Sequence, residues 1–301
     1  MQVFRKKSGL RRMAKQRAFF WCLIALPLAQ FCIFYIGVNF NSFLLAFRNY
    51  DYVQGYSFAG WENFSRVWYD WVNNESFSTM FLNSLLTYAV TLVVGITLAL
   101  LFSYFIYKKM PLSNLFRVML FMPNILSTLV MVLLFKYFTE NAIPEIFHNS
   151  IGGLLSTNDT AKPTLLFFLV WTGFGTQVLM YVGAMNNIPE SAVESAKLDG
   201  ITPVKEFAFI TLPLIWPTFV TFIIVGLAAL FTNQLNLYSF YERAAPVSVQ
   251  TIGYYLYKAA QGGTPPEYPY LAAMGLMLTF IALPIVFAVK WVLEKFGPRT
   301  V

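Results

Sequence analysis

Groups of uncharged polar residues interrupt three long apolar runs of this sequence, and their side chains could contact a polar solute. In hydrocarbon such groups are costly unless they face protein or a water-filled cavity. Amides and hydroxyls can hydrogen-bond a neutral polyhydroxylated solute, and aromatic rings can stack on its faces. The alternative is hydrogen bonding between neighbouring helices. The candidates are Asn124, Ser127 and Thr128; Thr172, Thr176, Gln177 and Tyr181; and Thr232, Asn233, Gln234, Asn236 and Tyr238.

The first and third groups allow more specific predictions. Asn124, Ser127 and Thr128 are spaced to share one face of a helix. Pro213 and Pro217, four residues apart at the start of the third run, predict a kink there because proline lacks an amide donor. The third group is the one that we favour as part of a solute pathway.

Residue patterns for catalysis are not found in the sequence. It has no Gly-x4-Gly-Lys-Ser/Thr segment, so we expect no ATP binding or hydrolysis by this chain alone. It has no nucleophile elbow, zinc-protease helix or cysteine–histidine arrangement, and its single His148 has no companion ligands for a metal. An intramembrane enzyme or sensor is an alternative class, but it would need a catalytic pair or a signalling domain, and neither is visible.

The composition places these residues in a membrane. Of 301 residues, 57% are hydrophobic and only 12% are charged, whereas soluble domains carry about 25% charged residues. Mean hydropathy is +0.59. These values exclude a water-soluble enzyme, a disordered tail and a disulfide scaffold. The fold class that they predict is an all-α membrane protein.

Six windows without charged residues are long enough to be spanning helices, each of which needs about 20 apolar residues. The windows are continuously apolar, which argues against the alternating pattern of a barrel. The third is short, and the fifth is longer than one crossing and should begin or end outside the hydrocarbon. They are 18–47, 76–107, 118–135, 163–189, 207–241 and 268–289.

The distribution of Lys and Arg predicts the orientation. Basic residues are concentrated in the segment 1–17, in the loops near 108–117 and 197–205, and in the tail 290–301. The positive-inside rule therefore places both termini in the cytoplasm, on either side of a transmembrane domain over 18–289. The net charge of +7 is an orientation signal and an attraction to anionic membrane lipid, so we expect no nucleic-acid partner.

The predicted cytoplasmic loop between the fourth and fifth windows, about 186–213, contains a short helix. Pro189 suits the first helical position, Glu190 favours the positive helix start, and Asp199-Gly200 suits a left-handed stop. Its side chains are mostly small, among them Ala192 and Ser195, which lets another surface approach the backbone. Such a projection suits insertion into a groove of a partner, while a solvated amphipathic loop is the simpler alternative.

This loop resembles the EAA loop of the membrane subunits of binding-protein-dependent ABC importers. The family pattern is Glu-Ala-Ala, three residues, Gly, nine residues and Ile-x-Leu-Pro. It maps onto Glu194-Ser195-Ala196, Gly200 and 210–213 with every spacing matched. Ser195 departs from the pattern, but it is another small residue.

Further segments resemble the carbohydrate permeases of the maltose-permease type. They are Gly60-Trp61-Glu62-Asn63-Phe64, Phe121-Met122-Pro123-Asn124-Ile125 and the segment 251–257. The resemblance covers about 18–298 and lacks the large periplasmic insertion of the maltose-system subunit.

The resemblance implies a type I ABC importer permease in the cell membrane of a bacterium. It implies a second, homologous permease subunit as a heterodimer partner, two ATPase subunits that hold ATP and Mg, and an extracellular solute-binding protein. The solute would be a sugar or oligosaccharide. A polyol phosphate is the alternative, but it should require basic groups at membrane depth, and the third to fifth windows have none. The residues implied in ATPase coupling are Glu190, Ala192, Glu194, Ser195, Ala196, Asp199, Gly200, Ile210, Leu212 and Pro213.

Overall fold

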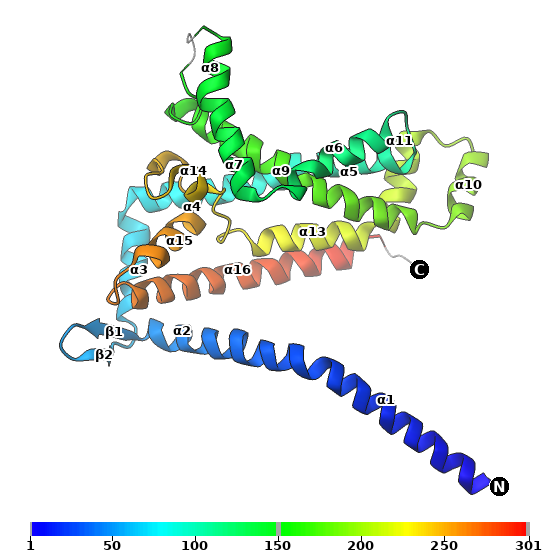
Figure 1. The fold of residues 1–301 in the computed structure, drawn as a ribbon, viewed down its shortest axis with the longest axis horizontal. Helices are drawn as coiled ribbons and strands as arrows, with labels where there is room; N and C mark the ends of the chain where they lie inside the picture. Colours follow the sequence, from blue (N-terminus) through cyan, green and yellow to red (C-terminus); the bar gives the residue numbers. More distant parts are fainter. Residues whose placement is uncertain (1, 149–151, 299–301) are drawn as a thin grey trace. The chain divides into compact units, whose positions relative to one another are not determined.

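The computed structural model describes residues 2–148 and 152–298, with side chains from Lys15 onward (Figure 1). The chain is mostly helical, and within the described residues its only sheet is a two-stranded hairpin. The chain forms two compact units, one from the residues up to Val67 together with Thr264–Leu276, and one from the rest. The predicted basic side chains before Lys15 lie outside the described residues.

Four helical stretches in the described part of the chain are long and apolar enough to cross a membrane, and they match the first, second, fourth and sixth predicted windows. Two bent helix pairs pass the same test together and fall on the third and fifth windows, so that up to six spans result. The continuous stretches are Lys15–Ala46, Glu75–Tyr107, Asn158–Asn186 and Tyr268–Phe296.

The third window is not one straight helix. Helix α6 (Ser113–Ile125) ends before α7 (Thr128–Tyr137) begins, and the two parts of the pair are bent by 101°. Ser127 begins the second helix, because its hydroxyl accepts the Val130 amide at 3.4 Å. The prediction that Asn124, Ser127 and Thr128 share a helical face is therefore wrong, since the helix breaks between them.

The fifth window contains both a bend and a break. The pair bends by 72° at Ile215, in agreement with the kink predicted from Pro213 and Pro217. Further along, residues 229–236 are not helical. The elements in order are α11 (Pro203–Glu206), a π-helical turn (Phe207–Thr211), α12 (Leu212–Leu214), α13 (Trp216–Ala228) and α14 (Leu237–Tyr241).

Helix α9 (Asn158–Asn186) is central to the larger unit and packs against α5 (Ile96–Tyr107) and α6. It approaches α6 so closely that a Cβ on Gly175 would lie 2.1 Å from the Leu120 carbonyl oxygen, which is typical of small residues at membrane helix crossings.

The remaining elements of this unit are α4 (Glu75–Val90) and its π-helical turn (Thr91–Gly95), a π-helical turn (Phe138–Ala142), α8 (Ile143–Ile146), α10 (Glu190–Leu198), a 3-10 turn (Val247–Val249) and α15 (Ile252–Gly262). Most of α16 (Tyr268–Phe296) also belongs here.

The smaller unit holds the first span, which is α1 (Gln2–Gln30), a π-helical turn (Phe31–Gly37) and α2 (Val38–Ala46). A hairpin that the sequence reasoning missed follows, with β1 (Arg48–Asp51) antiparallel to β2 (Gly55–Phe58). The Asp51 carboxylate accepts the Val53 and Gln54 amides at 2.7 and 3.0 Å to close its turn. The Asn63 amide, from α3 (Glu62–Asn73), donates to the carbonyls of Ala46 and Arg48 at 3.0 and 2.8 Å. Asn63 therefore holds the base of the hairpin to the end of the span.

Candidate coupling loop and solute pathway

The predicted loop helix is present as α10 (Glu190–Leu198). Pro189 precedes it with φ −58° and ψ 128°, and its carbonyl accepts the Ala192 amide at 3.1 Å. Proline thus stands immediately before the helix, one residue earlier than predicted, where it still leaves no amide unpaired. Glu190 in the first turn and Lys197 in the last complement the helix dipole.

The end of α10 has the hydrogen bonds of a Schellman motif. The Ile201 amide donates to the Ala196 carbonyl at 3.2 Å, and the Gly200 amide donates to the Lys197 carbonyl at 3.0 Å. Gly200 has φ +72°, as the predicted left-handed stop requires. A Cβ at Gly200 would meet nothing within 4 Å, so glycine is needed here for its backbone conformation and for no contact within this chain.

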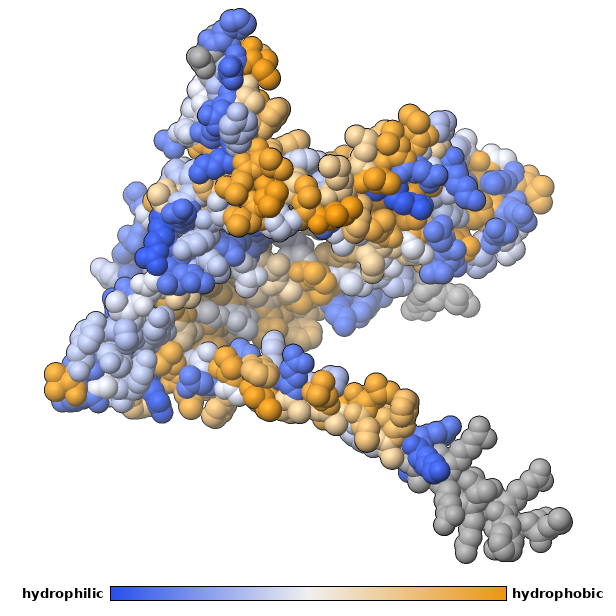
Figure 2. All heavy atoms as spheres, in the orientation of Figure 1, coloured by the Kyte–Doolittle hydropathy of each residue, from blue (hydrophilic) through white to orange (hydrophobic). Residues whose placement is uncertain are grey.

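Helix α10 is anchored on one side and exposed on the other. Val193 and Ala196 are buried, and Val193 joins the hydrophobic core of the larger unit. Leu198 is 90% exposed, although an apolar side chain favours burial. The other exposed residues among those predicted for coupling are Glu190, Glu194, Ser195, Asp199 and Gly200, while Ala192 is half-buried. On the face drawn in Figure 2, hydrophilic side chains gather over α10.

The second part of the motif lies in a packed segment. Ile210, Leu212 and Pro213 are half-buried in the π-helical turn and α12, and Leu212 packs against the core. Thr211 between them is fully buried. These residues build the connection from the loop to α13, whereas the residues of α10 form the exposed surface.

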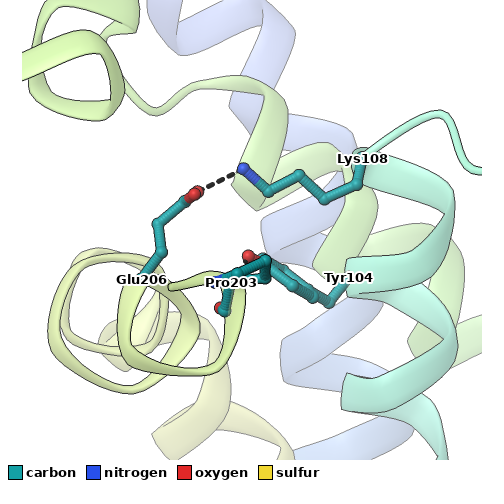
Figure 3. Close-up of polar contacts among 4 residues, drawn as sticks. All are labelled: Tyr104, Lys108, Pro203 and Glu206. Carbon is teal, nitrogen blue, oxygen red and sulfur yellow. Dashed lines mark hydrogen bonds and ion pairs between the residues drawn. The ribbon is translucent and has the colours of Figure 1, made fainter. Parts of the chain in front are cut away.

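An ion pair that the sequence reasoning missed holds the segment after α10. The Lys108 ammonium, at the end of α5, pairs with the buried Glu206 carboxylate on α11 (Figure 3). The Tyr104 hydroxyl donates to the Pro203 carbonyl at 2.9 Å. The partners lie about 100 residues apart in the sequence, so no local spacing could have indicated the pair.

The candidates on α6 and α9 contact one another or the core. The Thr176 hydroxyl donates to the Asn124 side-chain oxygen at 3.0 Å, which is the interhelical bond expected under the simpler interpretation. Gln177 is half-buried, and in the described part of the chain its side-chain oxygen has no hydrogen-bond partner. Tyr181 is fully buried against Phe222, with ring centroids 5.1 Å apart. Ser127 and Thr128, at the start of α7, are exposed.

The candidates after α13 lie in and beside the non-helical segment 229–236. The Asn233 side chain accepts the Leu235 amide at 2.9 Å, and Leu235 and Asn236 both have positive φ. The Gln234 side-chain oxygen is buried without a partner among the described residues. Tyr238, at the start of α14, lies 5.1 Å from the Tyr257 ring. Such irregular backbone at membrane depth is tolerated only where it is buried in protein or lines a cavity.

A polar face of α4 adjoins this segment and was missed by sequence reasoning. A small cavity of about 60 Å³ lies between α4 and residues 226–233, and it is lined by Ser84, Thr87, Tyr88, Thr91 and Asn233 among others. The spacing of these hydroxyls along a single helix face could have indicated it. The Asn83 amide donates to the carbonyls of Ser248 and Gln250 at 3.0 and 2.8 Å, so the same face also holds the chain before α15.

Comparison with known proteins places this geometry in a family. Residues 91–301, which include α10 and the broken fifth span, match the family described as binding-protein-dependent transport system inner membrane component. The chain is 25% identical over 291 residues to an arabinooligosaccharides transport system permease protein, AraP, of Bacillus subtilis, covering 93% of this chain and 90% of the relative. It is 26% identical over 277 residues to a lactose transport system permease protein, LacF, of Rhizobium radiobacter, covering 89% and 91%.

The fold also matches a solved transporter. A chain of a bacterial alginate ABC transporter, in complex with its alginate pentasaccharide-bound periplasmic protein, superposes with a TM-score of 0.78 at 18% identity, covering 96% of this chain and 99% of that one. The predicted type I permease fold is therefore confirmed, as is a multi-pass protein of the plasma membrane. The chain belongs to the family of binding-protein-dependent transport system inner membrane components.

Proposed function

We propose that this chain is one of two permease subunits of an ABC importer for a sugar or oligosaccharide. An extracellular binding protein delivers the solute, and two ATPase subunits, which hold ATP and Mg, drive the transport. The observation that carries the proposal is α10, whose exposed face combines carboxylates, a small Ser195 and the 90% exposed Leu198. The residues exposed on that face are uncovered within the described part of the chain, so a partner subunit is the natural occupant, and the resemblance to the EAA loop implies that this partner is the ATPase.

The candidate pathway favours a neutral, hydroxyl-rich solute. Its side chains are amides, hydroxyls and phenol rings, from Asn124 and Gln177 to Asn233, Gln234 and Tyr238. No Lys or Arg lies in residues 118–135, 163–189 or 207–241, so an anionic phosphate group has no counter-charge there. The named solutes of the relatives, arabinooligosaccharides and lactose, are of the neutral class.

The apolar surface supports a second permease subunit. The most apolar window of the first span, within Lys15–Ala46, has no buried residues. Figure 2 shows many hydrophobic side chains along this helix, with hydrophilic ones between them. The inner side of the α6–α7 bend is an apolar hollow of about 710 Å³ lined by Met119, Met122, Leu134 and Trp171 among others. Lipid can cover the first span. The concave apolar hollow is instead suited to the side chains of a packed helix from a second permease subunit.

Reconstitution tests the proposal. The chain is assembled in liposomes with a second permease, an ATPase and a binding protein of the same importer, and uptake of a set of neutral oligosaccharides is measured. We expect uptake that depends on both ATP and the binding protein, and no ATP hydrolysis by this chain alone. Uptake that continues without the ATPase, or that is selective for polyol phosphates over every neutral sugar, would contradict it.

A further inference from the structure

Helix α11, which follows α10 in the chain, contacts the end of α5 through both its first and its last residue. Glu206, the last residue of α11, is 3% exposed and pairs with Lys108 at the end of α5. Pro203, the first residue of α11, accepts the Tyr104 hydroxyl at 2.9 Å. Figure 3 shows the Lys108–Glu206 pair as a dashed line, with Tyr104 and Pro203 drawn beside it. Helix α11 is therefore held to α5 by a charge pair and by a hydrogen bond.

The environment of the pair makes it hard to separate. The Lys108 side chain is 19% exposed and the Glu206 side chain 5%. The Lys108 ammonium also lies 5.4 Å from the Tyr104 ring centroid and 5.6 Å from that of Tyr107. Separating the partners would leave a buried carboxylate without a counter-charge, which is strongly unfavourable. This contact is therefore suited to transmit a displacement of α11 to the end of α5.

The link between α10 and α11 is different in kind. It consists of residues 199–202, all of which are exposed except the half-buried Ile201. Gly200 within it has open space around its Cβ position. After α10, the Lys108–Glu206 pair is thus the first ionic contact in the described part of the chain that ties the loop to a different span.

We propose that Lys108, Glu206 and Tyr104 form a clamp that transmits movement of α10 to the second span, in addition to the fifth span into which α11 continues. They are positioning residues for transport, and the inference rests on the proposed function. With the clamp closed, displacement of the loop carries the end of α5 with it. With the clamp broken, α10 still docks on its partner, but the second span no longer follows.

The test uses the assembled importer in liposomes and measures the number of solute molecules taken up per ATP hydrolysed. The variants are E206Q, K108Q, Y104F and the charge-swapped pair K108E/E206K. The matched control is E294Q, which removes the exposed Lys290–Glu294 pair within α16 (3.8 Å), a contact that joins no two spans. Copurification of the ATPase with each variant reports docking by α10 separately from transmission.

We expect E206Q and K108Q to lower the transport-to-hydrolysis ratio by about fivefold or more, in the range of typical coupling energies, with the ATPase still copurifying. Y104F should have a smaller effect in the same direction, K108E/E206K should recover most of the ratio, and E294Q should leave it unchanged. A merely structural ion pair would lower the amount of assembled importer and leave the ratio per assembled complex unchanged.

If either single variant fails to accumulate, the transport-to-hydrolysis ratio is measured for the double variant K108Q/E206Q instead, because it contains no unpaired buried charge. A ratio equal to that of the unchanged importer in this double variant would overturn the clamp. Loss of ATPase copurification in E206Q would also overturn it, since the residue would then act in docking. Failure of the proposed function is distinguishable, because the unchanged importer would then show no ATP-dependent uptake at all.

Discussion

The exposed loop that carries α10 and the broken segment 229–236 both interrupt the succession of long helices, but they differ in what explains them. Residues 229–236 are held by contacts within the chain, such as the Thr251 hydroxyl that donates to the Asn233 carbonyl at 2.8 Å. On α10, Glu194 and Leu198 are exposed, and their side chains form no such contacts with the other described residues. The broken segment can therefore be understood from contacts among the described residues, whereas the proposed function assigns the exposed face of α10 to a second protein.

Two glycines show the same difference. A Cβ on Gly253 would lie 2.6 Å from the Thr232 carbonyl carbon and 2.7 Å from the Asn233 carbonyl oxygen, so close packing requires glycine there. At Gly200 a Cβ would meet nothing, and only the positive φ of +72° requires glycine. Substitution should therefore damage folding at the first position, and the shape of an exposed loop at the second.

The largest expected effect is that of Gly253→Ala. The added methyl group overlaps backbone atoms that cannot rotate away, so stability should fall by about 3 kcal/mol, the upper range for overpacking. Thermal unfolding of the detergent-solubilised protein measures this. Gly183→Ala is the control, because its Cβ position is open. Equal stability of the two variants would show that α15 does not pack on residues 232–233 as described.

The next effect concerns coupling with little change in folding. Glu194→Lys reverses a charge on the exposed face of α10, and ATP hydrolysis stimulated by the binding protein should fall about tenfold, equivalent to about 1.4 kcal/mol. The unfolding temperature should stay the same, because Glu194 is exposed and forms no ion pair among the described residues. Unchanged stimulation would mean that this face does not contact the ATPase.

A smaller effect is expected for Gly200→Ala. Alanine in the left-handed region costs about 1 kcal/mol, and the cost falls on the Schellman motif at the end of α10. Hydrogen exchange of the Ile201 amide, which donates to Ala196, should become about fivefold faster. The Val193 amide, in the preceding turns, provides the internal control. If the Ile201 amide exchanged at an unchanged rate, the left-handed stop would not be what holds the helix end.

The smallest effect is expected for Ser195→Ala, which restores the family pattern. The Ser195 hydroxyl donates to the Ser191 carbonyl at 2.8 Å within the same helix, and loss of this exposed bond should change stability by less than about 0.5 kcal/mol. Stimulated ATP hydrolysis should stay within about twofold of the original. A large loss would show that the hydroxyl itself contacts the ATPase and that a small side chain at this position is not sufficient.

Local signals predicted helix α10 well, whereas features that depend on long-range contacts were not predicted. Pro189, Glu190 and Gly200 determine the ends of α10 through neighbouring backbone groups, so their positions could be read from the sequence. The break at Ser127 could not, because the charge-free window that contains Asn124 and Thr128 is equally compatible with a straight helix. The Lys108–Glu206 pair depends on how α5 and α11 pack, and no periodicity encodes it.

The central claim, that α10 is the surface by which an ATPase drives this permease, is tested most directly by crosslinking in the assembled importer. Cys22 and Cys32, both exposed on the first span, are first replaced by serine, and a single cysteine is then placed at Leu198 or Ser195. With a short photoactivatable crosslinker, we predict a covalent product with the ATPase subunit whose yield changes on adding ATP. If the crosslinker reacted only with water or lipid, in an importer that still takes up solute, the result would contradict the claim.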